Sequence, residues 1–565
     1  MEESAKSFRL RNSWIPVDES AFEQEVIHTP GLVQPFGVLL ACRRSDLRIV
    51  HVSANCDWIL GREPREVLQM TLPALFGQEQ SDEVTRALSE PGHRSASRLS
   101  IGKLRPGGLE NHVVAHTIDA DLICIELEPS LPGHRWDLLS KRLESIVEAL
   151  QKTGSQQDLC DAAAKEMRAL TGHDHVMIYK FHPDHHGEVI AEDKIAELSP
   201  NINLHFPASD IPQQARALYL LQRTRLIADV DYVPVPLVSL KHASVPCALD
   251  MTYSSLRSVS PMHLQYLRNM KVGASFSISL VHEQKLWGLI ICQHRTPLLV
   301  PPEVRSLCDL LGQVISMLTG VTQNNEDYVE QLFNGSRLKE LESVLAGPCV
   351  ISEMLVEHAD LFLGSVGASG ATICIDGQLR SCGTVLPPHE RHALLALLKE
   401  HGDEPIFLSE YLAGIMPALK IYKDVASGIL AIPLDGSYKS YVLWYRPEIT
   451  QTVEWGGNPN EAKVRDVVTG LVGPRESFAA WRESVSGHAK AWSPRERAMA
   501  LDVQRLLKAT VSRQGDAAKA KLSLVDVLTL LPNRRVLLDR LSRLQEDGVL
   551  EHASLLFVTW TDSRA

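Results

Sequence analysis

Two stretches of the sequence carry most of its information about the fold: residues 206–212 read FPASDIP, and residues 256–270 read LRSVSPMHLQYLRNM. Both lie between strand-forming runs. Residues 175–181 (HVMIYKF) precede them, and residues 275–294 (SFSISLVHEQKLWGLIICQH) contain two apolar runs around a polar turn. Apolar and β-branched runs bounded by turn residues predict strands. We therefore place both stretches in one sheet domain, at residues 135–320.

The sequence before this domain predicts a smaller one. In residues 26–130, GVLLACR and RIVHVSAN are separated by the polar RSDL, which predicts a hairpin, and DLICIELEP predicts a further strand. This is a small α/β domain. Residues 1–25 are polar and form an N-terminal extension, whereas residues 136–170 carry leucine, isoleucine and valine at helical spacing.

After the central domain, a run that opens with two prolines at 301–302 predicts a long linking helix. A third sheet domain follows at 325–490, and its Gly- and Pro-rich part, 453–482, predicts a long excursion from the sheet. Ser-Pro then opens an amphipathic helix at 493–522. Its apolar stripe, which is either core or a dimer seam, contains Met499, Val503, Leu506 and Leu507.

Composition excludes several classes of protein. The 565 residues carry a net charge of -12, with an isoelectric point near 6.0, which argues against affinity for nucleic acid or for anionic membranes. The ten cysteines occur singly, without zinc-ligand spacing, so we expect reduced thiols and no metal. The first ten residues have no apolar core of a secretory signal, and we expect a cytoplasmic protein.

Four strings together identify a family. They are IHTPGLVQPFG (27–37), FPASDIP (206–212), LRSVSPMHLQYLRNM (256–270) and GPRESF (473–478), the last preceded by WGG. In this order, and in three successive domains, they resemble the photosensory module of bacterial phytochromes, whose PAS, GAF and PHY domains bind a linear tetrapyrrole. The resemblance implies an α+β fold of three sheet-plus-helix domains joined by long helices, with the pigment in the second.

The second domain supplies the residue types that a long conjugated plate with two propionates requires. Such a pocket needs apolar and aromatic walls, with cations and hydroxyls for the carboxylates. We expect aromatic walls from Tyr179, Phe206 and Tyr266, and propionate contacts from Arg225 and Arg257. Hydroxyl donors are expected from Ser260, Ser275, Ser277 and Tyr219.

Further roles follow from the resemblance alone. In the family, the aspartate that matches Asp210, which precedes Ile211 and Pro212, offers its backbone carbonyl to the pyrrole nitrogens. Its carboxylate pairs with the arginine that matches Arg475, close to Ser477, in an excursion called the tongue. His263 would join the proton network beside the pigment. The family switches by rotation of a pyrrole ring and refolding of the tongue from strand to helix.

The sequence departs from the family at the attachment point. Bacterial members hold biliverdin through a cysteine whose position matches Phe22, and no cysteine precedes Cys42. Plant and cyanobacterial members use a cysteine at the position of Met262. A thioether requires a thiol, so we expect non-covalent binding of biliverdin IXα, with Cys247 as a minor alternative for attachment. Gln293 replaces a histidine that faces the rotating ring; it can still form a hydrogen bond but cannot titrate.

The end of the chain resembles a different family. Residues 523–544, SLVDVLTLLPNRRVLLDRLSRL, resemble the opening of a diguanylate cyclase domain, with Leu530 in place of a glycine. Only 32 residues follow Asn533, so we expect the fragment 523–565 to be inactive and the chain not to be an enzyme. An ordinary helix–turn–helix is the alternative explanation.

The sequence therefore predicts a bilin-binding red/far-red photoreceptor without enzymatic activity. We expect a homodimer formed through the long helices, a conformational output to an unknown downstream partner, and no contact with nucleic acid or membrane. The opposing hypothesis is a light-independent signalling scaffold, or a sensor of another ligand, that descends from a phytochrome which lost its pigment attachment.

Overall fold

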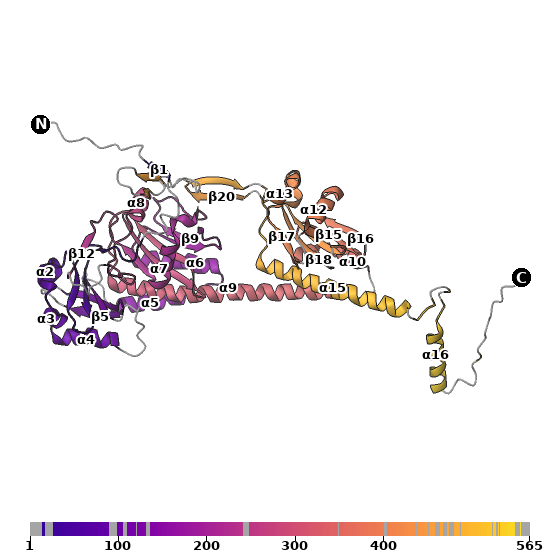
Figure 1. Cartoon of the computed structure of the whole chain (residues 1–565), viewed down its shortest axis with the longest axis horizontal. Coiled ribbons are helices and arrows are strands. Elements are labelled where there is room, and N and C mark those ends of the chain that lie inside the picture. Colours follow the sequence, from indigo (N-terminus) through magenta and orange to yellow (C-terminus); the bar gives the residue numbers. More distant parts are fainter. Residues whose placement is uncertain are drawn as a thin grey trace. The chain divides into compact units, whose positions relative to one another are not determined.

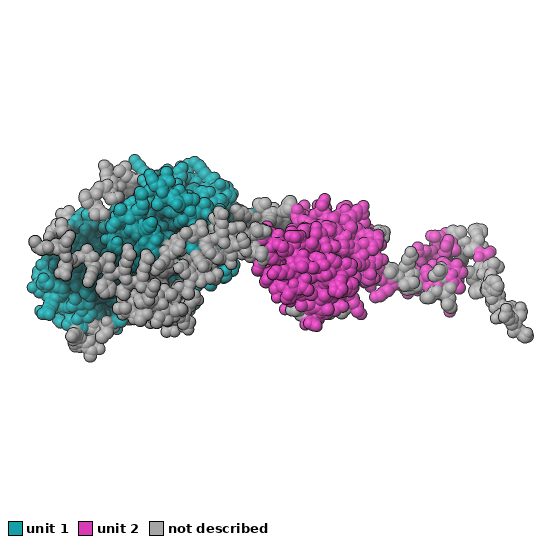
Figure 2. All heavy atoms as spheres, turned by 90° about the horizontal axis from the view of Figure 1, so that it is seen from above, with its two compact units in different colours: residues 1–327, 452–483 teal, residues 328–451, 484–565 magenta. Residues whose placement is uncertain are grey.

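The computed structural model describes residues 14–16, 26–89, 99–104, 110–119, 121–130, 136–240, 248–347, 350–400, 404–435, 438–449, 451–457, 464–466, 472–473, 480–485, 487–522, 524–526, 529, 531–547 and 554. The chain forms two compact units, which Figure 2 distinguishes by colour. Unit 1 comprises residues 1–327 and 452–483, and unit 2 comprises residues 328–451 and 484–565.

The first domain of unit 1 is built on a seven-stranded sheet. The predicted hairpin is confirmed: β3 (Val38–Arg43) pairs antiparallel with β4 (Ile49–Ser53), and β7 (Leu122–Pro129) pairs with the other edge of β3. The strand order is β2 (Leu32–Val33), β12 (Val235–Ser239), β4, β3, β7, β6 (Asn111–Thr117) and β5 (Leu99–Leu104). Because β12 comes from the second domain, the first two domains share this sheet. The helices are α1 (Asp57–Leu60), α2 (Pro64–Val67), α3 (Leu72–Phe76) and α4 (Gln78–Ser89).

The second domain has a sheet of eight strands, and the strands expected from the sequence are confirmed. The order is β11 (Thr224–Ile227), β13 (Ala274–His282), β14 (Lys285–His294), β8 (His175–Phe181), β9 (Gly187–Lys194), β10 (His205–Phe206), β20 (Gln451–Gly456) and β23 (Ala480–Val485). The polar turn between β13 and β14 has Glu283 and Gln284 at positive φ, as tight hairpin turns require.

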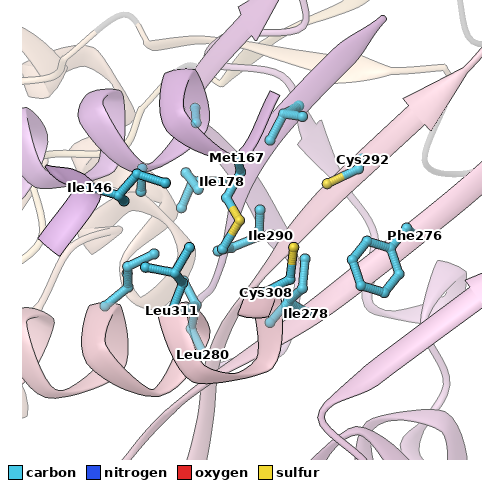
Figure 3. Close-up of a cluster of buried hydrophobic side chains, with 14 of the residues drawn as sticks. Ile146, Met167, Ile178, Phe276, Ile278, Leu280, Ile290, Cys292, Cys308 and Leu311 are labelled. Carbon is cyan, nitrogen blue, oxygen red and sulfur yellow. The ribbon is translucent and has the colours of Figure 1, made fainter. Parts of the chain in front are cut away.

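One face of this sheet is covered by helices. Alternate strand residues such as Ile178, Phe276 and Ile290 pack against α5 (Trp136–Gln151), α6 (Gln156–Thr171) and α9 (Pro302–Val344), as Figure 3 shows for part of this core. Because side chains alternate along a strand, the intervening residues point to the opposite face. That face carries the short helices η3 (Ala208–Asp210), α7 (Gln213–Leu221) and α8 (Pro261–Asn269).

The helix α9 continues from unit 1 into unit 2 (Figure 1). Within the described residues, its first part, Pro302–Asn325, is the one helix that is long and apolar enough to span a membrane. Buried core helices have the same composition, and Leu307, Cys308, Leu311 and Ile315 of this stretch lie in the core of the second domain. Packing within the protein therefore accounts for these four residues of the apolar run.

Unit 2 contains a five-stranded antiparallel sheet and the helices around it. The strand order is β16 (Gln378–Gly383), β15 (Gly370–Ile375), β19 (Tyr441–Arg446), β18 (Gly428–Pro433) and β17 (Phe407–Ser409). The helices are α10 (Ile351–Glu357), α11 (Ala359–Ser365), α12 (Pro388–Glu400), α13 (Leu412–Ile415), η4 (Pro417–Tyr422), α14 (Lys423–Ala426), α15 (Pro494–Leu522) and α16 (Arg534–Glu546).

The predicted cap of α15 is confirmed. Ser493 Oγ accepts a hydrogen bond from Glu496 N, and Glu496 Oε2 accepts one from Ser493 N, a reciprocal capping box. The apolar stripe on this helix belongs to the core of unit 2, because Met499, Val503 and Leu507 are fully buried in a cluster with Trp444. The alternative that this stripe forms a dimer seam is therefore wrong for these residues.

The excursion from the third sheet that is expected at 453–482 contains strands in its described parts. Its described parts include β20 and β23, which extend the eight-stranded sheet, and β21 (Val464–Asp466) and β22 (Val472–Gly473), which form a small sheet with β1 (Trp14–Pro16). We call residues 453–482 the excursion below.

Candidate functional site

A cavity lies on the face of the eight-stranded sheet opposite the buried core. Its empty volume is about 1660 Å³, counted out to its open mouth. The expected bilin-binding residues of the second domain all line this cavity: Tyr179, Phe206, Asp210, Ile211, Pro212, Tyr219, Arg225, Arg257, Ser260, His263, Tyr266, Ser275, Ser277 and Gln293. The structure thus brings together side chains that are up to 114 residues apart, from Tyr179 to Gln293.

Strand alternation decides which side chains enter the cavity. On β13, Phe276 and Ile278 belong to the core, whereas Ser275 and Ser277 line the cavity. Gln293 on β14 lies directly opposite Ser275 in the antiparallel register. The pattern of alternating serine and large apolar residues in SFSISL therefore places hydroxyls on one face and the core on the other.

The FPASDIP segment crosses the cavity from β10 to α7. Pro212 caps the N-terminus of α7, and η3 turns the chain so that Asp210 lies beside α8. Tyr266 on α8 donates a hydrogen bond from its hydroxyl to Asp210 Oδ2 at 3.0 Å. This contact ties the two diagnostic stretches of the sequence together across the cavity.

The two arginines have different surroundings. Arg225 donates hydrogen bonds to backbone carbonyls of residues 254–258, including Ser254 O at 3.4 Å and Ser258 O at 3.3 Å, and to Arg257 O. Arg257 is 6% exposed, and its Nη1 is buried with no hydrogen-bond partner in the described part of the chain. Burial and the nearby Arg225 guanidinium lower the pKa of Arg257 to about 9. The cavity therefore presents a buried guanidinium whose Nη1 has no hydrogen-bond partner among the described residues.

His263 is uncharged in this environment. Its ring is parallel to that of Tyr266, with the ring centroids 6.0 Å apart and an interplanar angle of 10°. Burial, together with the positive charge of Arg225, lowers the pKa of His263 to about 4. A neutral imidazole can both donate and accept a hydrogen bond, whereas an imidazolium can only donate.

The lowered pKa of His263 predicts a loss of stability in acid. The unfolded chain binds a proton near pH 6.5 and the folded chain only near pH 4, so stability falls as the pH decreases between these values. At pH 5.5 the expected loss in the free energy of unfolding from this histidine is about 1.4 kcal/mol.

Urea unfolding at pH 7.5 and 5.5 should show a smaller effect of pH on the free energy of unfolding for His263→Gln than for the wild type. His389→Gln is the control, since its side chain is 93% exposed. An equal pH effect in His263→Gln and wild type would contradict this assignment.

The segment 27–37 joins the first domain to the site. Gln34 Nε2 donates to Leu226 O at 2.8 Å, and Gln34 N donates to Leu256 O at 2.7 Å. Ile27 at its start lines the cavity. The sequence pattern signalled this segment only through its family resemblance, because its contacts lie about 200 residues away along the chain.

Glu126 on β7 fixes the same region from the first domain. Its fully buried carboxylate accepts hydrogen bonds from Ser255 N at 3.1 Å, Leu256 N at 3.0 Å and the Ser254 hydroxyl. These bonds position the backbone just before Arg257. Sequence reasoning missed Glu126, because an acidic residue in a predicted strand normally indicates a solvent-facing position.

The excursion reaches the wall of the cavity. In β20, Trp455 pairs with His205 in parallel register, and a Cβ atom on Gly456 would lie 2.5 Å from the Phe206 ring. Only glycine permits this close approach. Of the other expected residues, Arg475, Ser477, Phe22 and Cys247 lie outside the described residues. The eight described cysteines are free and buried, as expected.

Comparisons with known proteins agree with this arrangement. Residues 22–130 match a model described as "PAS fold", residues 155–322 one described as "GAF domain", and residues 339–515 one described as "Phytochrome region". The chain is 36% identical over 505 residues to cyanobacterial phytochrome B of Nostoc sp., with 88% of this chain and 67% of that protein covered. It is 31% identical over 491 residues to a bacteriophytochrome of Xanthomonas campestris; the match covers 85% of this chain and 76% of that protein.

Two solved structures have similar folds. A crystal structure of a bacteriophytochrome from the photosynthetic bacterium R. palustris has a TM-score of 0.77 and 32% identity, with 87% of this chain and 99% of that chain covered. The photosensory core module of a Stigmatella aurantiaca phytochrome has a TM-score of 0.74 and 32% identity; the match covers 89% of this chain and 99% of that chain.

Proposed function

Because the chain belongs to the phytochrome family, we propose that it is a red/far-red photoreceptor that holds biliverdin IXα in the cavity of its second domain. The observation that carries the proposal is the buried guanidinium of Arg257, whose Nη1 has no partner among the described residues. A bilin propionate is an anion of the right kind to neutralise it. When bound, the bilin supplies the absorption of visible light.

The rest of the cavity suits such a ligand. Tyr179, Phe206 and Tyr266 provide aromatic surface, and the hydroxyls of Ser275 and Ser277 offer donors to carboxylates. The neutral ring of His263 and the backbone of Asp210 are polar groups beside these apolar walls. These residues fit a flat, largely apolar molecule that carries two carboxylates.

We propose that binding is non-covalent. The sequence has no cysteine before Cys42, and Met262 stands at the other position that the family uses for attachment. Met262 lines the cavity, so no thiol is present there. A buried ligand with paired carboxylates can bind tightly without a covalent bond, because a preformed pocket reduces the entropy lost on binding.

We also propose how the protein acts on its surroundings. Output is conformational, through refolding of the excursion and movement of the long helices, and the chain has no enzymatic activity of its own. Homodimerisation would use α9, where Leu310, Met317 and Val321 recur at helical spacing with exposed fractions of 45%, 61% and 49%. The buried free cysteines are typical of a reducing compartment, which supports a cytoplasmic location.

An absorption spectrum of the purified protein mixed with biliverdin tests the proposal. We expect a red band that changes reversibly under red and far-red light, and pigment that separates from the protein on gel filtration in acid urea. Pigment that stays attached would contradict non-covalent binding and direct attention to Cys247. Absence of a band would overturn the photoreceptor proposal and favour the light-independent scaffold.

A further inference from the structure

Three histidines meet beside the excursion, at a place that does not line the cavity. One possible ligand nitrogen of each of His182, His186 and His205 lies within 4.8 Å of those of the other two. The first two belong to the turn that joins β8 to β9, and the third opens β10. The prediction that the chain binds no metal was based on its cysteines, which lack zinc-ligand spacing, and did not consider these histidines.

Backbone pairing explains why the three rings meet. His182 N donates to His186 O at 2.9 Å, so the two residues face each other across the β8–β9 hairpin. Residues opposite each other on antiparallel strands have Cβ atoms about 5 Å apart. In the pairing of β10 with β9, His205 lies opposite Glu188, two residues beyond His186.

Carboxylates already orient two of the rings. His182 Nε2 lies 2.8 Å from Glu188 Oε2, and His186 Nδ1 lies 2.5 Å from Asp184 Oδ1. Each ring therefore keeps its other nitrogen for a further ligand. Imidazoles that bind a metal through one nitrogen usually donate the other N–H to a carboxylate, which fixes the tautomer and raises the basicity of the ligand.

The third ring carries an independent signal. His205 Nδ1 is buried and has no hydrogen-bond partner in the part of the chain that the structure describes. A buried polar atom without a partner is rare in a native fold and requires an explanation. A neutral imidazole has a lone pair on one ring nitrogen, which a metal ion can bind.

We propose that His182, His186 and His205 form a binding site for a divalent transition-metal ion of the Zn²⁺ class, with Glu188 supporting it from behind His182. Three imidazoles favour Zn²⁺, Ni²⁺ or Cu²⁺ over Mg²⁺ or Ca²⁺, which prefer oxygen ligands. The side chains of His182 and His186 are 30% and 21% exposed, so an ion can enter from solvent.

Binding requires a small local rearrangement. Zn–N distances of about 2.0 Å place the nitrogens of a tetrahedral site about 3.3 Å apart. In the structure without an ion, the three histidine nitrogens lie within 4.8 Å of one another, so they must move closer together. His182 and His186 are stacked, with centroids 4.3 Å apart and an angle of 5°, so their rings must rotate for both lone pairs to reach one ion.

The site has a built-in reporter. The Trp455 ring of β20 lies 5.8 Å from the His205 ring and 5.9 Å from the His186 ring, measured between centroids. An ion held by these histidines would therefore lie against the strand through which the excursion joins the sheet. Paramagnetic Ni²⁺ or Cu²⁺ at this place should quench the fluorescence of Trp455.

Calorimetric titration of the pigment-free protein with Zn²⁺ tests the proposal, using protein without a polyhistidine tag that has been dialysed against a chelator. We expect one ion per chain. His205→Ala and His186→Ala should each weaken binding by about 100-fold or more, and Glu188→Gln by about 10- to 100-fold, the range for partners behind a ligand. His389→Ala, on an exposed side chain, should bind like the wild type.

Unchanged Zn²⁺ affinity in His205→Ala, or the absence of stoichiometric binding in the wild type, would overturn the proposal. Circular dichroism of each variant without metal establishes that a loss of binding does not reflect unfolding. As a second readout, Ni²⁺ should quench the tryptophan emission of the wild type more than that of Trp455→Phe, because the variant lacks the tryptophan beside the site. Equal quenching in the two proteins would also overturn the proposal. Neither experiment uses pigment, so its outcome is independent of bilin binding.

Discussion

Replacing Arg257 by alanine is expected to weaken biliverdin binding by about 10- to 150-fold, which corresponds to the 1.5–3 kcal/mol of a hydrogen bond to a charged group. The reason is that Arg257 offers the cavity a buried guanidinium nitrogen with no partner among the described residues. Titration of the apoprotein with biliverdin, followed by the red absorption band, measures the change in affinity. If non-covalent binding is too tight for direct titration, the rate of release to an excess of a bilin-scavenging protein gives the same comparison.

Two variants make this result specific. Arg268→Ala is the matched control, because Arg268 is also an arginine of this domain but pairs with Asp231 at 2.7 Å, away from the cavity lining. It should bind biliverdin like the wild type. Arg257→Lys should lose less affinity than Arg257→Ala, since lysine keeps the charge but not the forked geometry. Equal affinity of wild type and Arg257→Ala would show that the propionates bind elsewhere.

The comparison between arginines also shows what the sequence could not predict. Residue types alone made Arg225 and Arg257 equivalent candidates for a propionate. In the structure, Arg225 is held by backbone carbonyls of residues 254–258, whereas Arg257 has an open donor. Whether an arginine already has hydrogen-bond partners depends here on residues about 30 positions away in the sequence, and no local sequence pattern predicts those contacts.

Other features were within reach of local reasoning. The alternation of serine with phenylalanine and isoleucine in residues 275–280 predicts a strand with two different faces, and the structure places one face in the core and the other in the cavity. The reciprocal cap of α15 is likewise encoded within four residues, Ser493 to Glu496. Patterns of this length are read reliably because the interacting groups are close in the sequence.

Features that depend on distant strands were not predicted. His205 reaches His182 and His186 only because β10 pairs with β9. The fully buried Glu126 contradicts the expectation that acidic residues in strands face solvent, because its partners come from residues 254–256. Burial of a charge can be recognised only when the group that satisfies it is known.

The second large effect that we expect concerns a buried ion pair at the junction of the first domain and α9. Arg305 Nη2 donates to Glu128 Oε2, and the two side chains are 8% and 4% exposed. Arg305→Met keeps most of the volume and the helix propensity but removes the guanidinium that pairs with the buried carboxylate of Glu128. We expect a loss of about 3–5 kcal/mol in the free energy of unfolding of this region.

A double-mutant cycle separates the charge from the packing. In Arg305→Met/Glu128→Gln no buried charge remains, so the double variant should recover most of the stability lost by the single one, because a buried pair replaced as a whole is often nearly neutral. Urea unfolding monitored by tryptophan fluorescence gives the free energies of Arg305→Met, Glu128→Gln and the double variant relative to wild type. Arg43→Met is the control, because Arg43 pairs with Asp46 at the surface, with exposed fractions of 38% and 45%. This variant should change the free energy of unfolding by less than about 1 kcal/mol.

Additive losses in the cycle would mean that Arg305 stabilises the junction through its aliphatic packing rather than by neutralising Glu128. Recovery in the double variant would instead show that the two charges are coupled and that the pair as a whole contributes close to zero net stability.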